Sequence, residues 1–179
     1  MTWNQDLFKR ALDFAALHHG PQTVPGSGYP YVVHVTKVAS EVLHAIGGDA
    51  SYDVNLAMTC ALLHDLVEDA GVTLEAISAQ FGQPTADGVA ALTKDARVPK
   101  DARMADALRR IALQPREVWL VKLADRITNL EPPPPQWSLE KRRAYRDEAA
   151  VILATLRAAH AGLAARFEVK LREYEQYCG

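Results

Sequence analysis

The sequence has few cysteines, almost no net charge and no long apolar run, and each of these shortages excludes a class of protein. Its two cysteines, Cys60 and Cys178, are too few and too far apart for the disulfide framework of a small secreted domain. A formal net charge of −2 gives no global sign of nucleic-acid binding. No apolar run approaches the ~20 residues of a membrane-spanning helix. We therefore expect no nucleic-acid partner and no membrane insertion.

The first residues also lack the features of a secretory signal. The segment MTWNQDLFKR is polar and charged, with no apolar stretch. This absence predicts a cytoplasmic protein. Hydrophobic residues make up 49% of the 179 positions, which is enough for a sizeable core. We expect residues 1–179 to form one domain.

Acidic and basic side chains are distributed unevenly along the chain. Residues 1–93 contain ten acidic and three basic residues, whereas residues 94–126 contain nine basic and five acidic residues. The acidic half could hold a cation, and the basic stretch could meet phosphate groups. Solvated helix faces are the alternative explanation of the same asymmetry.

Apolar residues recur at helical spacing along most of the chain, and no convincing period-2 strand is present. Helices are predicted over residues 3–19, 31–46 and 52–69, and the last of these should be buried because its centre is almost entirely apolar. Further helices are expected over residues 73–81, from 84, over 101–113, from 115 to the proline run 132–135, and over 138–177 with a break at Gly162. The predicted fold class is all-α, a single compact bundle of about eight to ten helices.

The sharpest chemical signal is the segment HDLVED, His64 to Asp69, at the end of the most apolar predicted helix. On a continuous helix, His64 and Glu68 form an i,i+4 pair, as do Asp65 and Asp69. Three carboxylates and an imidazole at the end of an apolar helix indicate a positive group among them. A solvated helix end is the alternative.

Two other positions could complete a metal site. His34 lies near the start of the second predicted helix, and Asp125 lies in the apolar segment VKLADRITNL. Each is more often structural when taken alone, but with His64 and Asp65 they make a mixed nitrogen and oxygen ligand set. This set suits Mn²⁺, Fe²⁺, Co²⁺ or Zn²⁺, whereas two imidazoles disfavour Mg²⁺ and Ca²⁺. The lack of thiolates disfavours a structural zinc site.

A divalent ion at these residues would make water a better nucleophile at neutral pH. Glu68 and Asp69 lie next to the predicted ligands in the sequence, so they could orient that water or carry its proton. The residues thus favour a metal-dependent hydrolase.

The order of these motifs resembles the HD hydrolase domain of RelA/SpoT-type alarmone enzymes, and especially their stand-alone small alarmone hydrolases. The resemblance covers nearly the whole chain and is carried by GYPYVVH, ALLHDLVED, TLEAISAQFG, LTK, WLVKLADRITNL and KRRAYRDEA. HD alone occurs in many phosphohydrolases, but HDxVED followed by KLADRxxN at this separation is specific.

The resemblance implies an HD-type metal-dependent phosphohydrolase domain over residues 1–179. It implies one Mn²⁺ at His34, His64, Asp65 and Asp125, with Glu68 and Asp69 as the catalytic pair. It also implies substrate-binding residues in the second half of the chain, at Asn129, Tyr145, Lys100, Lys141, Arg142 and Trp137.

The implied activity is hydrolysis of the 3′-pyrophosphate of a purine alarmone, (p)ppGpp or (p)ppApp, with release of pyrophosphate. The partner would be a small nucleotide substrate, and the reaction would belong to the stringent response. One alternative is an HD phosphatase acting on another nucleotide, such as a 5′-nucleotide or an NADPH-like 2′-phosphate. Another is a nucleotide-sensing module without turnover, although pure binding does not require Glu68 and Asp69.

The chain departs from the family pattern before the first histidine of the motif. Where the family usually has Gln-x-Arg-Lys, this chain has Gln22 to Pro25, so that Val24 replaces an arginine that stacks on guanine in the family. Val35 replaces the proline that follows the first metal histidine. Since valine provides neither a cationic plane nor hydrogen bonds, we predict relaxed purine specificity or a preference for adenine.

Overall fold

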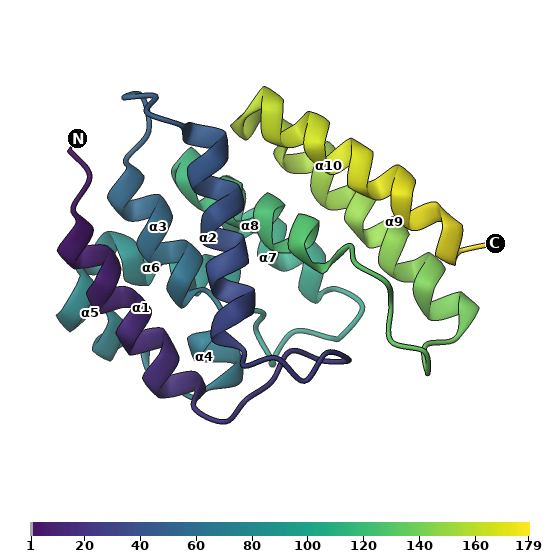
Figure 1. The fold of residues 1–179 in the computed structure, drawn as a ribbon, viewed down its shortest axis with the longest axis horizontal. Coiled ribbons are helices and arrows are strands. Elements are labelled where there is room, and N and C mark those ends of the chain that lie inside the picture. Colours follow the sequence, from purple (N-terminus) through teal and green to yellow (C-terminus); the bar gives the residue numbers. More distant parts are fainter. Residues whose placement is uncertain (1) are drawn as a thin grey trace.

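The computed structural model describes residues 2–179, and within this range it contains helices and no strand (Figure 1). The predicted all-α class is therefore confirmed. The helices are α1 (Gln5–His19), α2 (Val32–Ile46), α3 (Val54–Leu63), α4 (Leu66–Asp69), α5 (Leu74–Phe81), α6 (Gln83–Leu92), α7 (Arg103–Ala112), α8 (Arg116–Asn129), α9 (Leu139–Leu156) and α10 (Ala161–Tyr174), with 3-10 turns at Arg157–Ala159 and Glu175–Tyr177.

Side-chain caps and prolines fix where many of these helices begin. Four helices start after a residue whose side-chain oxygen accepts a first-turn backbone N–H, namely Asn4, Asp53, Thr73 and Ser138. Pro84 lies in the first turn of α6, and Pro115 immediately precedes α8, where its missing N–H costs no helical hydrogen bond. The helix starts predicted at positions 73, 84 and 115 are confirmed.

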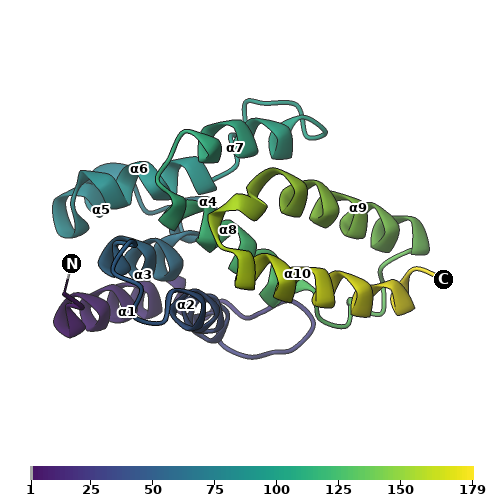
Figure 2. The same cartoon turned by 90° about the horizontal axis from the view of Figure 1, so that it is seen from above.

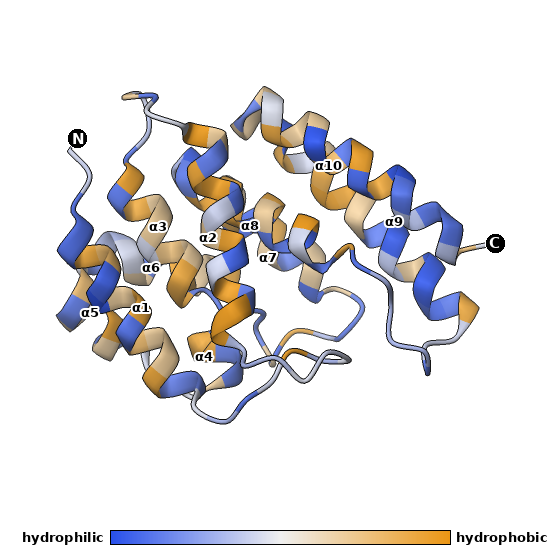
Figure 3. Ribbon diagram, viewed as in Figure 1, coloured by the Kyte–Doolittle hydropathy of each residue, from blue (hydrophilic) through white to orange (hydrophobic). Residues whose placement is uncertain are grey.

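The core lies where α1, α2 and α8 pack around α3, whose residues from Ala57 to Leu63 are all buried. Figure 3 shows hydrophobic residues concentrated along α2 and α3, with more hydrophilic residues along α9. In Figure 2, α5, α6 and α7 run along one side of this core, and the α9–α10 pair lies beyond α8. None of the helices in the described range is long and apolar enough to cross a membrane.

The predicted continuous helix over residues 52–69 is wrong, because the helix is interrupted near its C-terminal end. Helix α3 ends at Leu63 and α4 begins at Leu66, with Asp65 at φ −97° and ψ −5° between them. The hydroxyl of Tyr31 donates to the Asp65 carboxylate at 2.6 Å, and Asp65 also lies within 3.0 Å of His64. These tertiary contacts override the helical pattern that the sequence predicts.

The predicted break at Gly162 lies a few residues earlier in the structure. Helix α9 ends at Leu156, and α10 begins at Ala161, so that Gly162 is in the first turn of α10. The imidazole of His160 accepts the backbone N–H of Leu163 at 3.1 Å and caps α10. Histidine is not among the residues that commonly cap a helix N-terminus, so the sequence pattern favours a break at the glycine instead.

Candidate active site

Three helical segments bring two imidazoles and an aspartate together in the centre of the domain. His34 comes from α2, His64 from the end of α3, and Asp125 from the buried middle of α8. One ligand atom from each of the three lies within 4.8 Å of the other two. Oδ1 of Asp125 is 3.5 Å from Nε2 of His34 and 3.8 Å from Nε2 of His64. The described residues therefore contain a possible metal site.

The hydrogen bonding of the two histidines fits a metal ion. Nε2 of His34 and Nε2 of His64 are both buried and have no hydrogen-bond partner. Nδ1 of His64 lies 2.9 Å from the carbonyl oxygen of Ala61, to which it donates, so the neutral ring has its lone pair on Nε2. A buried polar atom without a partner costs about 1–3 kcal/mol. A cation between the rings would remove this cost.

Electrostatics at the site also favours a positive charge. Burial alone would lower the pKa of His64, but Asp65 and Asp125 outweigh burial and raise this pKa to about 10. The field that favours a proton on His64 equally favours a divalent cation bound to its Nε2. Proton and metal ion therefore compete for the same nitrogen.

Asp65 lies at the edge of this group. Its Oδ2 is 3.0 Å from Nε2 of His64 and 3.6 Å from Nε2 of His34, without the alignment of a hydrogen bond. Burial would raise the pKa of Asp65, but His64 outweighs it and holds that pKa at about 2. Burial and Asp65 raise the pKa of Tyr31 above its usual value, so its hydroxyl stays a proton donor.

Asp125 is held by two further residues of α8. Nζ of Lys122 lies 3.0 Å from Oδ2, and the side-chain amide of Asn129 donates to Oδ1 at 2.6 Å. Burial would raise the pKa of Asp125, but Lys122 and the two imidazoles keep it well below its usual range. The sequence analysis missed Lys122, although its i,i+3 spacing from Asp125 within KLAD was a usable signal.

Glu68 and Asp69 lie beside the metal-binding group on α4. Glu68 accepts two hydrogen bonds from Lys94, one from the backbone N–H and one from Nζ, both at 3.1 Å. Asp69 reaches the surface, yet burial of its carboxyl and the charges of Asp65 and Glu68 raise its pKa. A carboxyl with a raised pKa is better suited to exchanging protons near neutral pH. Lys94, which fixes Glu68, was not predicted.

Two cavities meet at this site. The smaller, of about 230 Å³, contains the carboxylates and is lined by Tyr31, His64, Asp65, Glu68, Asp69, Leu92, Lys94, Lys122, Asp125, Arg126, Asn129, Tyr145 and Glu148. The larger, of about 640 Å³, shares Asn129 and Tyr145 with it and includes His34. Ligand pockets typically have ~300–1,000 Å³, so the larger cavity can hold a nucleotide.

Two loops, residues of α2 and α8, and several aromatic side chains line the larger cavity. Residues 24–29 form one side, and the proline run 132–135 forms the other. The loops lie close to each other, since a Cβ at Gly26 would lie 3.6 Å from Pro134. The rings of Trp137 and Tyr145, whose centroids are 5.2 Å apart, complete the lining.

Some of the predicted substrate-binding residues line the larger cavity, and others lie at its border. Asn129, Tyr145 and Trp137 line the larger cavity. Nζ of Lys141 lies 4.1 Å from the centroid of the Trp137 ring, at the border of this cavity. A guanidinium nitrogen of Arg142 lies 3.4 Å from the carbonyl oxygen of Pro135. The two cations thus border the cavity rather than line it.

Lys100 is exposed and lies outside the linings of both cavities. The cations that do line the smaller cavity are Lys94, Lys122 and Arg126. Arg126 pairs with Glu148, and its guanidinium lies 4.2 Å from the centroid of the Tyr145 ring. None of these three cations was selected from the sequence.

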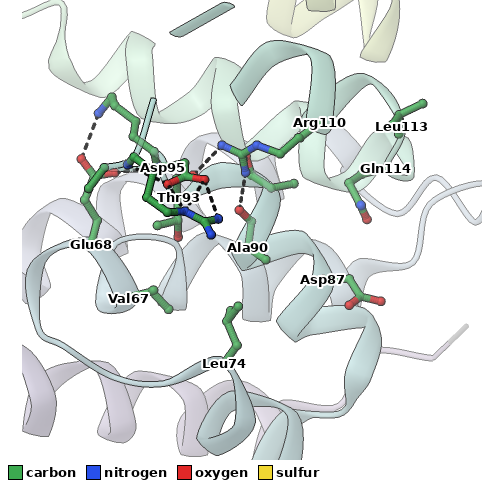
Figure 4. Close-up of a pocket in the computed structure, with 14 residues that line it drawn as sticks. Val67, Glu68, Leu74, Asp87, Ala90, Thr93, Asp95, Arg110, Leu113 and Gln114 are labelled. Carbon is green, nitrogen blue, oxygen red and sulfur yellow. Dashed lines mark hydrogen bonds and ion pairs between the residues drawn. The ribbon is translucent and has the colours of Figure 1, made fainter. Parts of the chain in front are cut away.

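A third cavity, of about 730 Å³, lies on the other side of Glu68 and Lys94 (Figure 4). Val67 and Leu74 form its apolar base, and Arg110 donates to the carbonyl oxygen of Ala90 at its edge. It contains none of the predicted metal ligands. The Glu68–Lys94 pair therefore forms a wall between this cavity and the metal-binding group.

Comparison with known proteins defines the class to which this arrangement belongs. The family model described as "HD domain" matches residues 11–164, and the chain belongs to this family. A solved structure titled as a metazoan ortholog of SpoT that hydrolyzes ppGpp superposes with a TM-score of 0.82 at 28% identity. The alignment covers 97% of this chain and 98% of that chain.

Two of the similar curated proteins are named for one hydrolysis reaction, and a third is named for a pyrophosphokinase reaction. A Danio rerio protein named guanosine-3′,5′-bis(diphosphate) 3′-pyrophosphohydrolase MESH1 is 32% identical over 85% of each chain. An Aquifex aeolicus 3′-pyrophosphohydrolase of the same substrate is 33% identical over 83% of this chain. A Mycobacterium leprae protein named probable GTP pyrophosphokinase is 36% identical over 71%. The chain spans only 20% and 16% of the lengths of these last two proteins.

Proposed function

We propose that residues 1–179 work as one HD-type domain that hydrolyses the 3′-pyrophosphate of a purine alarmone, (p)ppGpp or (p)ppApp, and releases pyrophosphate. The observation that carries this proposal is the pair of unpartnered imidazole nitrogens facing Asp125, beside a cavity of nucleotide size. The names of the D. rerio and A. aeolicus relatives support the choice of substrate.

The proposed cofactor is one Mn²⁺ held by His34, His64 and Asp125, with Asp65 as the fourth ligand. Two neutral nitrogens and two carboxylate oxygens suit this ion better than Mg²⁺ or Ca²⁺. When bound, the ion would act as a Lewis acid towards a phosphoryl oxygen and would make water more acidic.

The reaction needs a proton to move from water to the departing ribose oxygen. A bond forms between the water oxygen and the phosphorus next to the ribose, and the bond from that phosphorus to the 3′-oxygen breaks. The raised pKa of Asp69 suits it to take the proton of the attacking water and to return it to the 3′-oxygen. Glu68, fixed by its two hydrogen bonds from Lys94, would orient the water.

We infer that three cations bind the substrate's phosphates. Lys94, Lys122 and Arg126 line the smaller cavity next to the carboxylates. Fixed positive charges in a partly enclosed site stabilise the charge that develops on the attacked pyrophosphate group. Asn129 and Tyr145, which line both cavities, would separate the phosphate end of the substrate from its base.

The larger cavity supports relaxed purine specificity, with adenine accepted or preferred. Val24, the proline run and the ring of Trp137 offer apolar and aromatic faces, which stack on any base. Among the described residues, its lining contains no arginine, and its charged members are Lys37 and Glu131. A wall of this kind stabilises guanine and adenine to a similar extent.

The deciding experiment is product analysis of the Mn²⁺-loaded protein with ppGpp, ppApp, a 5′-nucleotide and NADPH. We expect pyrophosphate from the two alarmones and no orthophosphate from the others. Release of orthophosphate from NADPH or a 5′-nucleotide as the main reaction would point to an HD phosphatase instead. Binding without turnover would point to a sensing module. A guanine preference in kcat/KM above about a hundredfold would contradict relaxed base recognition.

A further inference from the structure

Tyr31 connects the end of α1 to the metal-binding group. It precedes α2 directly, and its hydroxyl donates a 2.6 Å hydrogen bond to Oδ2 of Asp65, 34 positions later in the chain. This is the same carboxylate oxygen that faces the two imidazoles, at 3.0 Å from His64 and 3.6 Å from His34. The hydrogen bond therefore acts on the oxygen that would meet the ion.

The ring of Tyr31 packs against two histidine rings. Its centroid is 4.5 Å from that of His19 and 5.2 Å from that of His34. His19 is the last residue of α1, is 3% exposed, and has its Nδ1 2.8 Å from the side-chain oxygen of Gln22. These contacts restrict rotation of the phenol away from Asp65.

We propose that Tyr31 is a positioning residue that holds Oδ2 of Asp65 in place for the metal ion. This inference rests on the metal site of the proposed function. A carboxylate oxygen has two lone-pair directions. The hydroxyl of Tyr31 occupies one of them, which leaves the other for the metal ion. Because Tyr31 donates a hydrogen bond but carries no charge, it orients Asp65 without repelling a cation.

Outer partners of metal ligands typically change metal affinity by about 10–100-fold when they are removed. Tyr31→Phe deletes only the hydroxyl and preserves the ring that packs against the two histidines. We expect its dissociation constant for Mn²⁺ to rise at least about tenfold. The loss should be overcome by excess Mn²⁺, since a positioning residue does not take part in the chemistry.

Tyr52 provides a matched control. It is 6% exposed, and its hydroxyl donates a 2.7 Å hydrogen bond to the carbonyl oxygen of Ala159, in a part of the core that contains no predicted metal ligand. Tyr52→Phe loses a buried hydrogen bond of similar length, so it should lower thermal stability in EDTA. The dissociation constant of this variant for Mn²⁺ should stay within about twofold of that of the unmodified protein, which is a small change because tenfold corresponds to about 1.4 kcal/mol.

The experiment titrates Mn²⁺ alone into the three proteins and measures free Mn²⁺ by electron paramagnetic resonance. If Tyr31→Phe is too unstable for titration, its Mn²⁺ affinity can be compared through Tm. The rise in Tm from EDTA to a fixed Mn²⁺ concentration depends on the same dissociation constant. A dissociation constant for Tyr31→Phe within twofold of the unmodified value overturns the inference. So does a loss of kcat that saturating Mn²⁺ does not restore. Failure of the unmodified protein to bind Mn²⁺ would overturn the proposed metal site instead.

Discussion

Replacing Lys122 by methionine should weaken the metal-free protein but strengthen metal binding. Lys122 and Asp125 form a buried ion pair at 3.0 Å, with 8% and 12% of their side-chain surfaces exposed. Removing one partner of a buried pair typically costs about 3–5 kcal/mol, because the other charge loses its compensation. Here the amide of Asn129 still donates to Asp125, and the raised pKa of His64 keeps a positive charge nearby at neutral pH. We therefore expect a loss of about 3 kcal/mol in EDTA.

With Mn²⁺ present, the ion itself would compensate the charge of Asp125. Only the hydrogen bond from Lys122 is then lost, which costs about 1 kcal/mol. The gain in unfolding free energy on adding Mn²⁺ should therefore be larger in the variant by about 2 kcal/mol, the difference between the two losses. This corresponds to roughly 30-fold tighter Mn²⁺ binding. Removing a positive charge from beside the ion acts in the same direction.

Urea unfolding in EDTA and in saturating Mn²⁺, together with calorimetric titration of Mn²⁺, measures both effects. Lys170→Met is the matched control, because Lys170 forms an i,i+3 pair with Glu173 at 3.1 Å on the outside of α10. A more exposed pair of this kind contributes less than about 1 kcal/mol, and its removal should not depend on the metal. Equal losses for Lys122→Met in the two conditions, or weaker Mn²⁺ binding, would refute the reasoning.

Three further predictions concern the catalytic pair and the core. Glu68→Gln and Asp69→Asn should retain Mn²⁺ in a titration but lose turnover by about 10²-fold or more, and near-normal turnover of either variant would remove its assigned role. Burial raises the pKa of Cys60 to about 12, so this thiol should resist iodoacetamide at pH 8 in the native protein and react after unfolding, as mass spectrometry would show. Gly88→Ala places a Cβ 2.7 Å from Sγ of Cys60, so it should destabilise by about 1–3 kcal/mol in urea despite the better helix propensity of alanine. Adding Cys60→Ala should relieve that clash, and a stabilising Gly88→Ala would show that the core adapts freely.

The features that the sequence predicted correctly depend on short-range chemistry. The cap at Thr73 and the prolines at positions 84 and 115 act within one helical turn, so their effect on a helix start can be read directly. The interruption between His64 and Leu66 has no such local signal. It accompanies a hydrogen bond to Tyr31, which comes from a different helix and is invisible to any local pattern.

In the site, too, residues with a local sequence signal can be predicted, whereas residues that depend on a distant partner cannot. Motif and residue type indicate three metal ligands, His34, His64 and Asp125. In the structure, one ligand atom from each lies within 4.8 Å of the others. Lys94 lies in a basic stretch, where a lysine resembles a solvated one until its partner is known, whereas the i,i+3 spacing of Lys122 from Asp125 was a signal that the sequence did offer. Lys100 was chosen from such a stretch on sequence similarity alone, and it is exposed outside the cavities.

The two aspartates of the metal-binding group differ in how their neighbours hold them. Tyr31 holds Asp65 with a neutral donor, whereas Lys122 holds Asp125 with a charged one. A neutral donor adds orientation without opposing a cation, so its removal should weaken metal binding. A charged donor stabilises the metal-free fold but competes with the ion, so its removal should tighten metal binding. Opposite responses of the two variants to Mn²⁺ would distinguish this division of roles from a general loss of packing, which would weaken metal binding in both.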